Sequence, residues 1–224
     1  MSALPATASQ LALGPDRLQQ NQSYVFDFAS EYGGGPVQEH GTLSLRRLDS
    51  LRVLVSGDNV RSGAGAGRDD GPPPPTTMPE RVAVRSADGR IAARGERSRV
   101  ADLIFDYDSL VTLLPRSGGE LAVGTRWTAT TRCWVSHTVS TGIPVTVVVT
   151  GRHGTTTELR ASGAKRLTLV VEGRRVTTDA AVSVEMSFVR ERLSRAVMRA
   201  TQAYRRDGVP AGGGSYSWTA TRTE

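Results

Sequence analysis

The segment VADLIFDYDSLVTLL, residues 100–114, decides the fold, because its apolar residues repeat with the period of a helix. Leu103, Tyr107, Leu110 and Leu114 are spaced i, i+4, i+7 and i+11, which places them on one helical face. Pro115 follows and ends the helix, since proline lacks a backbone N–H. Most other segments alternate as strands do. The sequence therefore predicts a mostly β protein, a curved antiparallel sheet or half-open barrel covered by one α-helix at about residues 100–114.

The strands are predicted from apolar residues at every second position. Tyr24, Phe26 and Phe28 alternate with smaller or polar residues, and the clearest case is the segment 180–188. There Val182, Val184, Met186 and Phe188 share one face. Residues 189–206 fit either element: Arg, Glu, Ala and Met favour a helix, whereas the neighbouring strands favour a strand. We favour the strand.

The chain is 224 residues long, which suits one β domain. We expect a flexible N-terminal arm at residues 1–21, followed by a single β domain at 22–224. Glycines and four consecutive prolines, Pro72 to Pro75, mark residues 57–79 as a loop. Residues 1–20 lack a basic segment followed by an apolar one, and no run approaches about 18 apolar residues. We therefore expect neither a signal peptide nor a transmembrane segment in the chain as given.

Basic residues outnumber acidic ones, 28 against 22, which gives a net charge of +6. The simplest interpretation is a solvated arginine-rich surface, and the alternative is an anionic partner such as lipid headgroups or nucleic acid. Aromatic residues are not interleaved with the arginines as stacking platforms, so we expect no nucleic-acid partner.

No sequence motif predicts catalysis or metal binding. The glycines at 63, 65 and 67 are not followed by Gly-Lys-Ser/Thr, so they do not predict a phosphate loop. His40, His137 and His153 lack the spacing of metal ligands. Asp102 and Asp106 lie four residues apart, and a solvated helix face explains them more simply than acid–base chemistry does. The single cysteine, Cys133, is expected to be a small buried side chain. We predict no catalytic residues, no metal site and no cofactor.

Apolar surface is the feature that does point to a function. A helix of this length spans about 22 Å, whereas eight strands span about 35 Å. More apolar sheet face is therefore present than one helix can hide, and a ligand, a partner or sheet curvature must bury the rest. The predicted lining residues come from the first strand, the helix and the strand at 180–188: Phe26, Leu103, Tyr107, Leu110, Leu114, Val184, Met186 and Phe188.

Three further segments carry a resemblance to a known group of proteins. They are Leu113-Leu114-Pro115, the strand opening Val123-Gly124-Thr125-Arg126-Trp127, and the late meander from Val182–Phe188 to Tyr216-Ser217-Trp218. Over residues 22–223 the chain resembles uncharacterised bacterial envelope proteins with a half-open β-clam fold, related in architecture to lipoprotein-localisation carriers and lipid-binding lipoproteins. The chain departs from that pattern in having no lipobox cysteine and no glycine near Glu191-Arg192.

The resemblance implies a location in the cell envelope or periplasm and a role in binding a hydrophobic ligand or lipoprotein. Together with the apolar surface, it leads us to expect a non-enzymatic protein that holds a lipid or lipidated partner between sheet and helix. The alternative is a structural or accessory subunit that docks its apolar face on a larger assembly. A hydrolase or isomerase built in a β cup is the third possibility.

Overall fold

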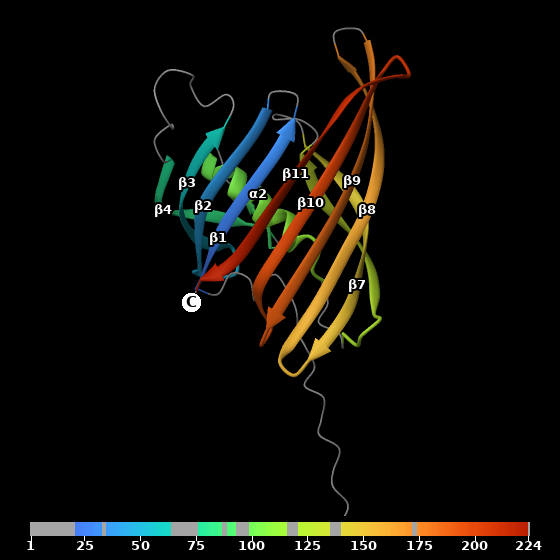
Figure 1. Cartoon of the computed structure of the whole chain (residues 1–224). Coiled ribbons are helices and arrows are strands. Elements are labelled where there is room, and N and C mark those ends of the chain that lie inside the picture. The colour runs from blue at the N-terminus through green and yellow to red at the C-terminus, as the bar shows by residue number, and fades with distance from the viewer. Residues whose placement is uncertain are drawn as a thin grey trace, which may run out of the picture.

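The computed structural model describes residues 21–32, 35–63, 76–86, 89–92, 99–115, 121–134, 140–171 and 174–223. Within these ranges the chain forms one helix and a single antiparallel sheet of eleven strands (Figure 1). The predicted mostly β fold with one helix is confirmed. The elements, in chain order, are β1 (Gln22–Tyr32), β2 (Gly35–Arg47), β3 (Arg52–Gly63), β4 (Thr76–Arg85), β5 (Ile91–Ala92), α2 (Arg99–Val111), β6 (Arg126–Trp134), β7 (Ser140–His153), β8 (Thr156–Val171), β9 (Arg174–Val189), β10 (Arg192–Arg206) and β11 (Val209–Thr223).

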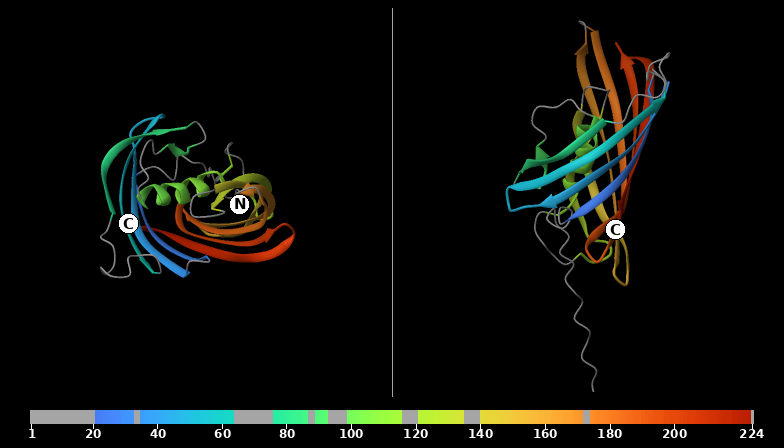
Figure 2. Two further views of the ribbon diagram at one scale, coloured as in Figure 1. Left: turned by 90° about the horizontal axis from the view of Figure 1, so that it is seen from above. Right: turned by 90° about the vertical axis from the view of Figure 1, so that its left-hand side faces the viewer.

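The sheet consists of two meanders that are joined in its middle. Its strand order is β5-β4-β3-β2-β1-β11-β10-β9-β8-β7-β6, so β1 pairs with β11 although they lie at opposite ends of the chain. The two edge strands, β5 and β6, do not pair with each other in the described residues, and the sheet stays open. Seen from above, β6–β11 curl into a narrow roll, while β1–β4 form a wider wall with α2 in its concavity (Figure 2).

The segment 189–206 is a strand, as the sequence favoured. β10 pairs with β9 and β11, and Ala196, Met198 and Ala200 are buried on the inner face. The turn before it contains no glycine, yet Arg190 and Glu191 both have positive φ, 49° and 66°. Such a pair of positive φ values is typical of the type I′ turn, whose twist matches that of two antiparallel strands.

The predicted loop at 57–79 is wrong at both of its ends. β3 continues to Gly63 and β4 begins at Thr76, because Gly57 and Asn59 pair with Leu43 and Gly41 of β2 despite their poor strand propensity. Neighbouring strands on both sides supply the backbone hydrogen bonds that the local sequence does not favour. Residues 64–75 and the arm at 1–20 lie outside the described residues.

From Leu103 to Val111, helix α2 is buried on all sides rather than on one face. Every side chain from Leu103 to Val111 is buried, including Asp106 and Asp108, so the predicted solvated face is wrong at Asp106. The side chain of Asp102 lies outside the described set. The helix ends at Val111, and the amides of Leu113 and Leu114 then bond to carbonyls three residues back before Pro115. Such tightening of the last turn is common at helix ends.

Candidate functional site

All eight residues predicted to line an apolar site are buried. Each is at most 5 % exposed, and all belong to one continuous hydrophobic cluster. Helix α2 contributes Leu103, Tyr107 and Leu110, and Leu114 follows the end of the helix at Val111. β1 contributes Phe26, and β9 contributes Val184, Met186 and Phe188. They therefore share one interior, which is the inner face of the curved sheet.

The structure places these residues in two halves of that interior. The backbone of α2 approaches β2, β3, β4 and β6 most closely, so the helix packs mainly on the first half of the sheet. The Tyr107 ring lies 6.1 Å from that of Tyr24 on β1. Val184, Met186 and Phe188 line the second half, between β8 and β10. The helix face and the β9 face thus contribute to one core from different sides.

One glycine sets how closely α2 approaches the sheet. A Cβ added to Gly41 on β2 would lie 2.5 Å from Cδ1 of Leu103 and 2.8 Å from the backbone oxygen of Asp58. No side chain other than hydrogen fits in that space. Leu103 therefore fills the position above β2 directly, and the helix lies against the strand.

Aromatic residues at the β1–β11 junction connect the two halves. Phe26 lies 5.9 Å from Trp218 between ring centroids, and Phe28 stacks on Tyr216 at 5.8 Å. Tyr24, Trp218 and Tyr216 were not among the predicted lining residues. Their period of two in sequence was visible, but the pairing of β1 with β11 was not, and only that pairing brings them together.

Helix α2 is also hydrogen-bonded to both edges of the sheet. On one edge the backbone N–H of Ile91 on β5 donates to Oδ1 of Asp108 at 2.9 Å. On the other, Nε1 of Trp127 on β6 donates to the carbonyl of Leu113 at 2.9 Å, and Oγ1 of Thr131 donates to that of Ser109 at 3.0 Å. We call these three hydrogen bonds the helix latch. The unpaired backbone groups of an exposed edge strand can pair with another chain. Here the segment of α2 bonds to both edge strands of the sheet.

A small polar cluster lies inside the rolled half of the sheet. Cys133 on β6 is fully buried, and its thiol interacts with Tyr216 and Gln202. Burial raises the pKa of the Cys133 thiol, while the hydrogen bonds with Tyr216 and Gln202 lower it and the charge of Asp106 raises it further. The raised pKa keeps the sulfur protonated and so unsuited to nucleophilic attack. The interpretation of Cys133 as a small buried side chain agrees with this environment.

The two described histidines do not assemble with the buried carboxylates. Asp108 accepts a hydrogen bond from the backbone of β5 in the helix latch. His40 and His153, the two described histidines, are exposed, and His40 pairs with Asp27 at 2.8 Å. His137 lies outside the described residues. Across the ranges that the structure describes, no group of three or more His, Cys, Asp or Glu residues could hold a metal ion.

The indole N–H of Trp218 is a buried donor in the interior. Nε1 of Trp218 has no hydrogen-bond partner among the described residues, although the side chain is only 1 % exposed. An unsatisfied buried donor costs about 1–3 kcal/mol. An acceptor atom brought in by a ligand would recover that energy.

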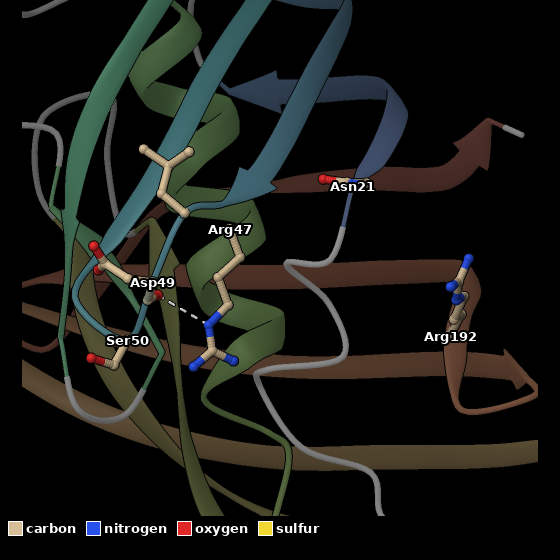
Figure 3. Close-up of a pocket in the computed structure, with 6 residues that line it drawn as sticks. Asn21, Arg47, Asp49, Ser50 and Arg192 are labelled. Atoms are coloured by element: carbon tan, nitrogen blue, oxygen red, sulfur yellow. Dashed lines mark hydrogen bonds between the residues drawn. The ribbon is translucent and has the colours of Figure 1, made fainter.

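A separate, open pocket lies at one end of the sheet (Figure 3). It has a volume of about 680 Å³ and is lined by Asn21, Arg47, Leu48, Asp49, Ser50 and Arg192. It is formed between the β2–β3 turn and the β9–β10 turn. No local sequence pattern predicts this pocket, because its residues come from segments far apart in the chain.

Comparison of the sequence with known protein families and with curated proteins finds no match. Among the described residues, no helix is long and apolar enough to cross a membrane.

Proposed function

We propose that the protein is a non-enzymatic binding protein that holds a hydrophobic ligand, a lipid or a lipidated partner, between its sheet and α2. The observation that carries this proposal is the continuous apolar inner face, which runs from β3 to β9 and meets α2, whose side chains from Leu103 to Val111 are all buried. The resemblance of the sequence to β-clam proteins points in the same direction.

Ligand uptake requires α2 to move. Leu103 already occupies the space over Gly41, and Tyr107 is fully buried against Tyr24. A ligand chain therefore has to replace contacts that the helix makes with the first half of the sheet. Each methylene that it buries contributes about 0.8 kcal/mol. The helix latch is the set of hydrogen bonds that opposes this movement.

The Trp218 donor adds a chemical preference to the apolar interior. A purely aliphatic ligand would leave its N–H without an acceptor. An ester or amide carbonyl close to the acyl chain would accept that hydrogen bond. We therefore expect acylated ligands to bind more tightly than alkanes of equal length.

The proposal is tested with protein purified without detergent. Native mass spectrometry should show copurified lipid, an environment-sensitive apolar dye should bind, and added lipid should raise the melting temperature. A ligand at 100 times its Kd stabilises the folded state by about 2.7 kcal/mol. Absence of all three effects would refute ligand carriage.

A pair of variants on β9 links binding to the interior. Met186→Asp places a charge on the buried face, whereas Ala181→Asp places the same charge on the exposed face of the same strand. Met186→Asp should abolish dye binding, because an unpaired charge in an apolar site is strongly unfavourable. Ala181→Asp should bind dye as the wild type does. Circular dichroism establishes that both variants fold, and the wild-type experiments do not depend on either.

An accessory subunit is the second candidate, favoured by apolar side chains on the outside. Leu51, Val82 and Val84 are 65 %, 55 % and 55 % exposed, and they lie near one another where β3 begins and β4 ends. Protein that binds no lipid or dye, but that loses its assembly with other proteins when Val82 and Val84 are changed to Ser, would favour this candidate.

A further inference from the structure

The open pocket at the end of the sheet carries more positive than negative charge. Arg47 at the end of β2 and Arg192 at the start of β10 line it from opposite sides (Figure 3). The only acidic residue among its described lining residues is Asp49. The carboxylate of Asp49 already bonds to Nε of Arg52 at 2.6 Å and to the backbone amides of Leu51 and Arg52 at 2.8 Å. The charge of Asp49 is thus balanced within its own turn.

A third arginine, Arg222, is placed near this pocket by the pairing of β1 with β11. Arg222 is directly opposite Tyr24 in the register, so the two side chains lie on the same face of the sheet. Neither Arg192 nor Arg222 forms an ion pair with any residue in the described ranges. We call Arg47, Arg192 and Arg222 the arginine mouth.

Tyr24 connects the arginine mouth to the apolar interior. Its ring packs 6.4 Å from Phe26 and 6.1 Å from Tyr107, and its hydroxyl donates to Oε1 of Gln22. Burial raises the pKa of Tyr24, and the positive charges of Arg222 and Arg192 partly oppose that rise. Both guanidinium groups therefore lie close enough to act on a side chain that belongs to the core.

We propose that the arginine mouth binds the anionic headgroup of an amphiphile, a phosphate or carboxylate, whose acyl chain lies in the apolar interior. This inference rests on the proposed function and adds the class of ligand. Arginine suits the role because its planar guanidinium group presents several N–H donors that match the oxygens of phosphate and carboxylate. The pocket volume of about 680 Å³ leaves room for such a headgroup.

The experiment compares two single-chain lipids of equal length by titration calorimetry: a lysophosphatidic acid and an uncharged monoacylglycerol. The wild-type protein should bind the phosphate lipid at least about tenfold more tightly, since a hydrogen bond to a charged group contributes enough for that ratio. The preference should shrink as salt is raised, because the pocket is open to solvent. Inorganic phosphate alone is titrated in parallel.

The variants are Arg192→Gln and Arg222→Gln, with Arg199→Gln as the matched control. Arg199 lies on β10 like Arg192 but is exposed on the outer face. Each mouth variant should weaken binding of the phosphate lipid about tenfold. Its affinity for the monoacylglycerol and the melting temperature of the free protein should stay as in the wild type. The control should bind both lipids as the wild type does.

The outcomes separate the two proposals. Equal affinity for the two lipids, unaffected by the mouth variants, would overturn the headgroup site while leaving hydrophobic carriage standing. Binding of inorganic phosphate as tight as that of the phosphate lipid would also overturn it, by showing a free-anion site that is independent of the interior. Failure to bind either lipid would overturn both proposals.

Discussion

The side chain of Asp108 on α2 accepts a hydrogen bond from the backbone N–H of Ile91 on β5, with Oδ1 and N 2.9 Å apart. Both residues are buried, at 5 % and 3 % exposure. β5 is an edge strand, so this N–H has no further strand to pair with. Asp108 therefore does for β5 what a neighbouring strand would otherwise do, and it fixes the helix to that edge.

Removing this carboxylate should destabilise the protein. Asp108→Ala leaves the Ile91 N–H buried without an acceptor, which should lower the free energy of unfolding by about 1–3 kcal/mol. Asp108→Asn keeps an oxygen acceptor and should cost less. Urea denaturation measures both. Equal stability of the alanine variant and the wild type would show that the hydrogen bond contributes nothing to holding β5.

The close approach of α2 to β2 predicts a large effect from one methyl group. Gly41→Ala places Cβ against Leu103 and against the backbone oxygen of Asp58, and backbone atoms move less readily than a side-chain end. Overpacking of this kind costs about 1–3 kcal/mol. Gln38→Ala, at an exposed position on the same strand, is the control and should change stability little. A neutral Gly41→Ala in thermal and urea unfolding would mean that α2 is not seated on β2 as described.

The environment of Cys133 predicts an unreactive thiol. The thiolate is the reactive form, and burial raises the pKa of Cys133, so little thiolate is present near neutral pH. Labelling by a thiol reagent should be slow in the folded protein and should require a higher pH than labelling of an exposed cysteine. In denaturant the reaction should be fast. Rapid labelling of the folded protein at neutral pH would contradict the buried position of β6.

The helix and most strands could be predicted from sequence because their patterns are local. The spacing of Leu103, Tyr107 and Leu110 indicated α2, although the helix ends three residues before the predicted Leu114. The period-two pattern of Val184, Met186 and Phe188 indicated β9, and all three are buried. The pairing of β1 with β11, by contrast, depends on residues about 200 positions apart, such as Ser23 and Thr223, and no local pattern encodes it.

The candidate site was predictable in composition but not in arrangement. The apolar lining residues follow from periodicity, and all of them lie in the core. Asp106 looked like part of a solvated face because helix periodicity alone cannot show that two sheet edges enclose the helix. The arginine mouth could not be predicted for a similar reason, since Arg47 and Arg192 lie at the ends of separate strands that only the curved sheet brings to one pocket. The scattered arginines suggested an anionic partner without saying where it binds.

The helix latch predicts the rate of ligand uptake, given that α2 must move to admit a ligand. Thr131→Val removes the hydroxyl that donates to Ser109 while keeping the shape of the side chain, and Trp127→Phe removes the donor to Leu113. Each hydrogen bond contributes about 1 kcal/mol, so each variant should speed opening by about fivefold, and the double variant by more.

Stopped-flow fluorescence with the apolar dye measures this rate, and Thr130→Val is the control. Thr130 neighbours Thr131 on β6 but is exposed on the outer face, so its change should leave the rate as it is in the wild type. Faster uptake in the latch variants alone would identify α2 as the moving element. Identical rates in the wild type and all four variants, together with normal dye affinity, would show that the ligand reaches the interior without displacing α2 from β6, for example through the arginine mouth beside Tyr24.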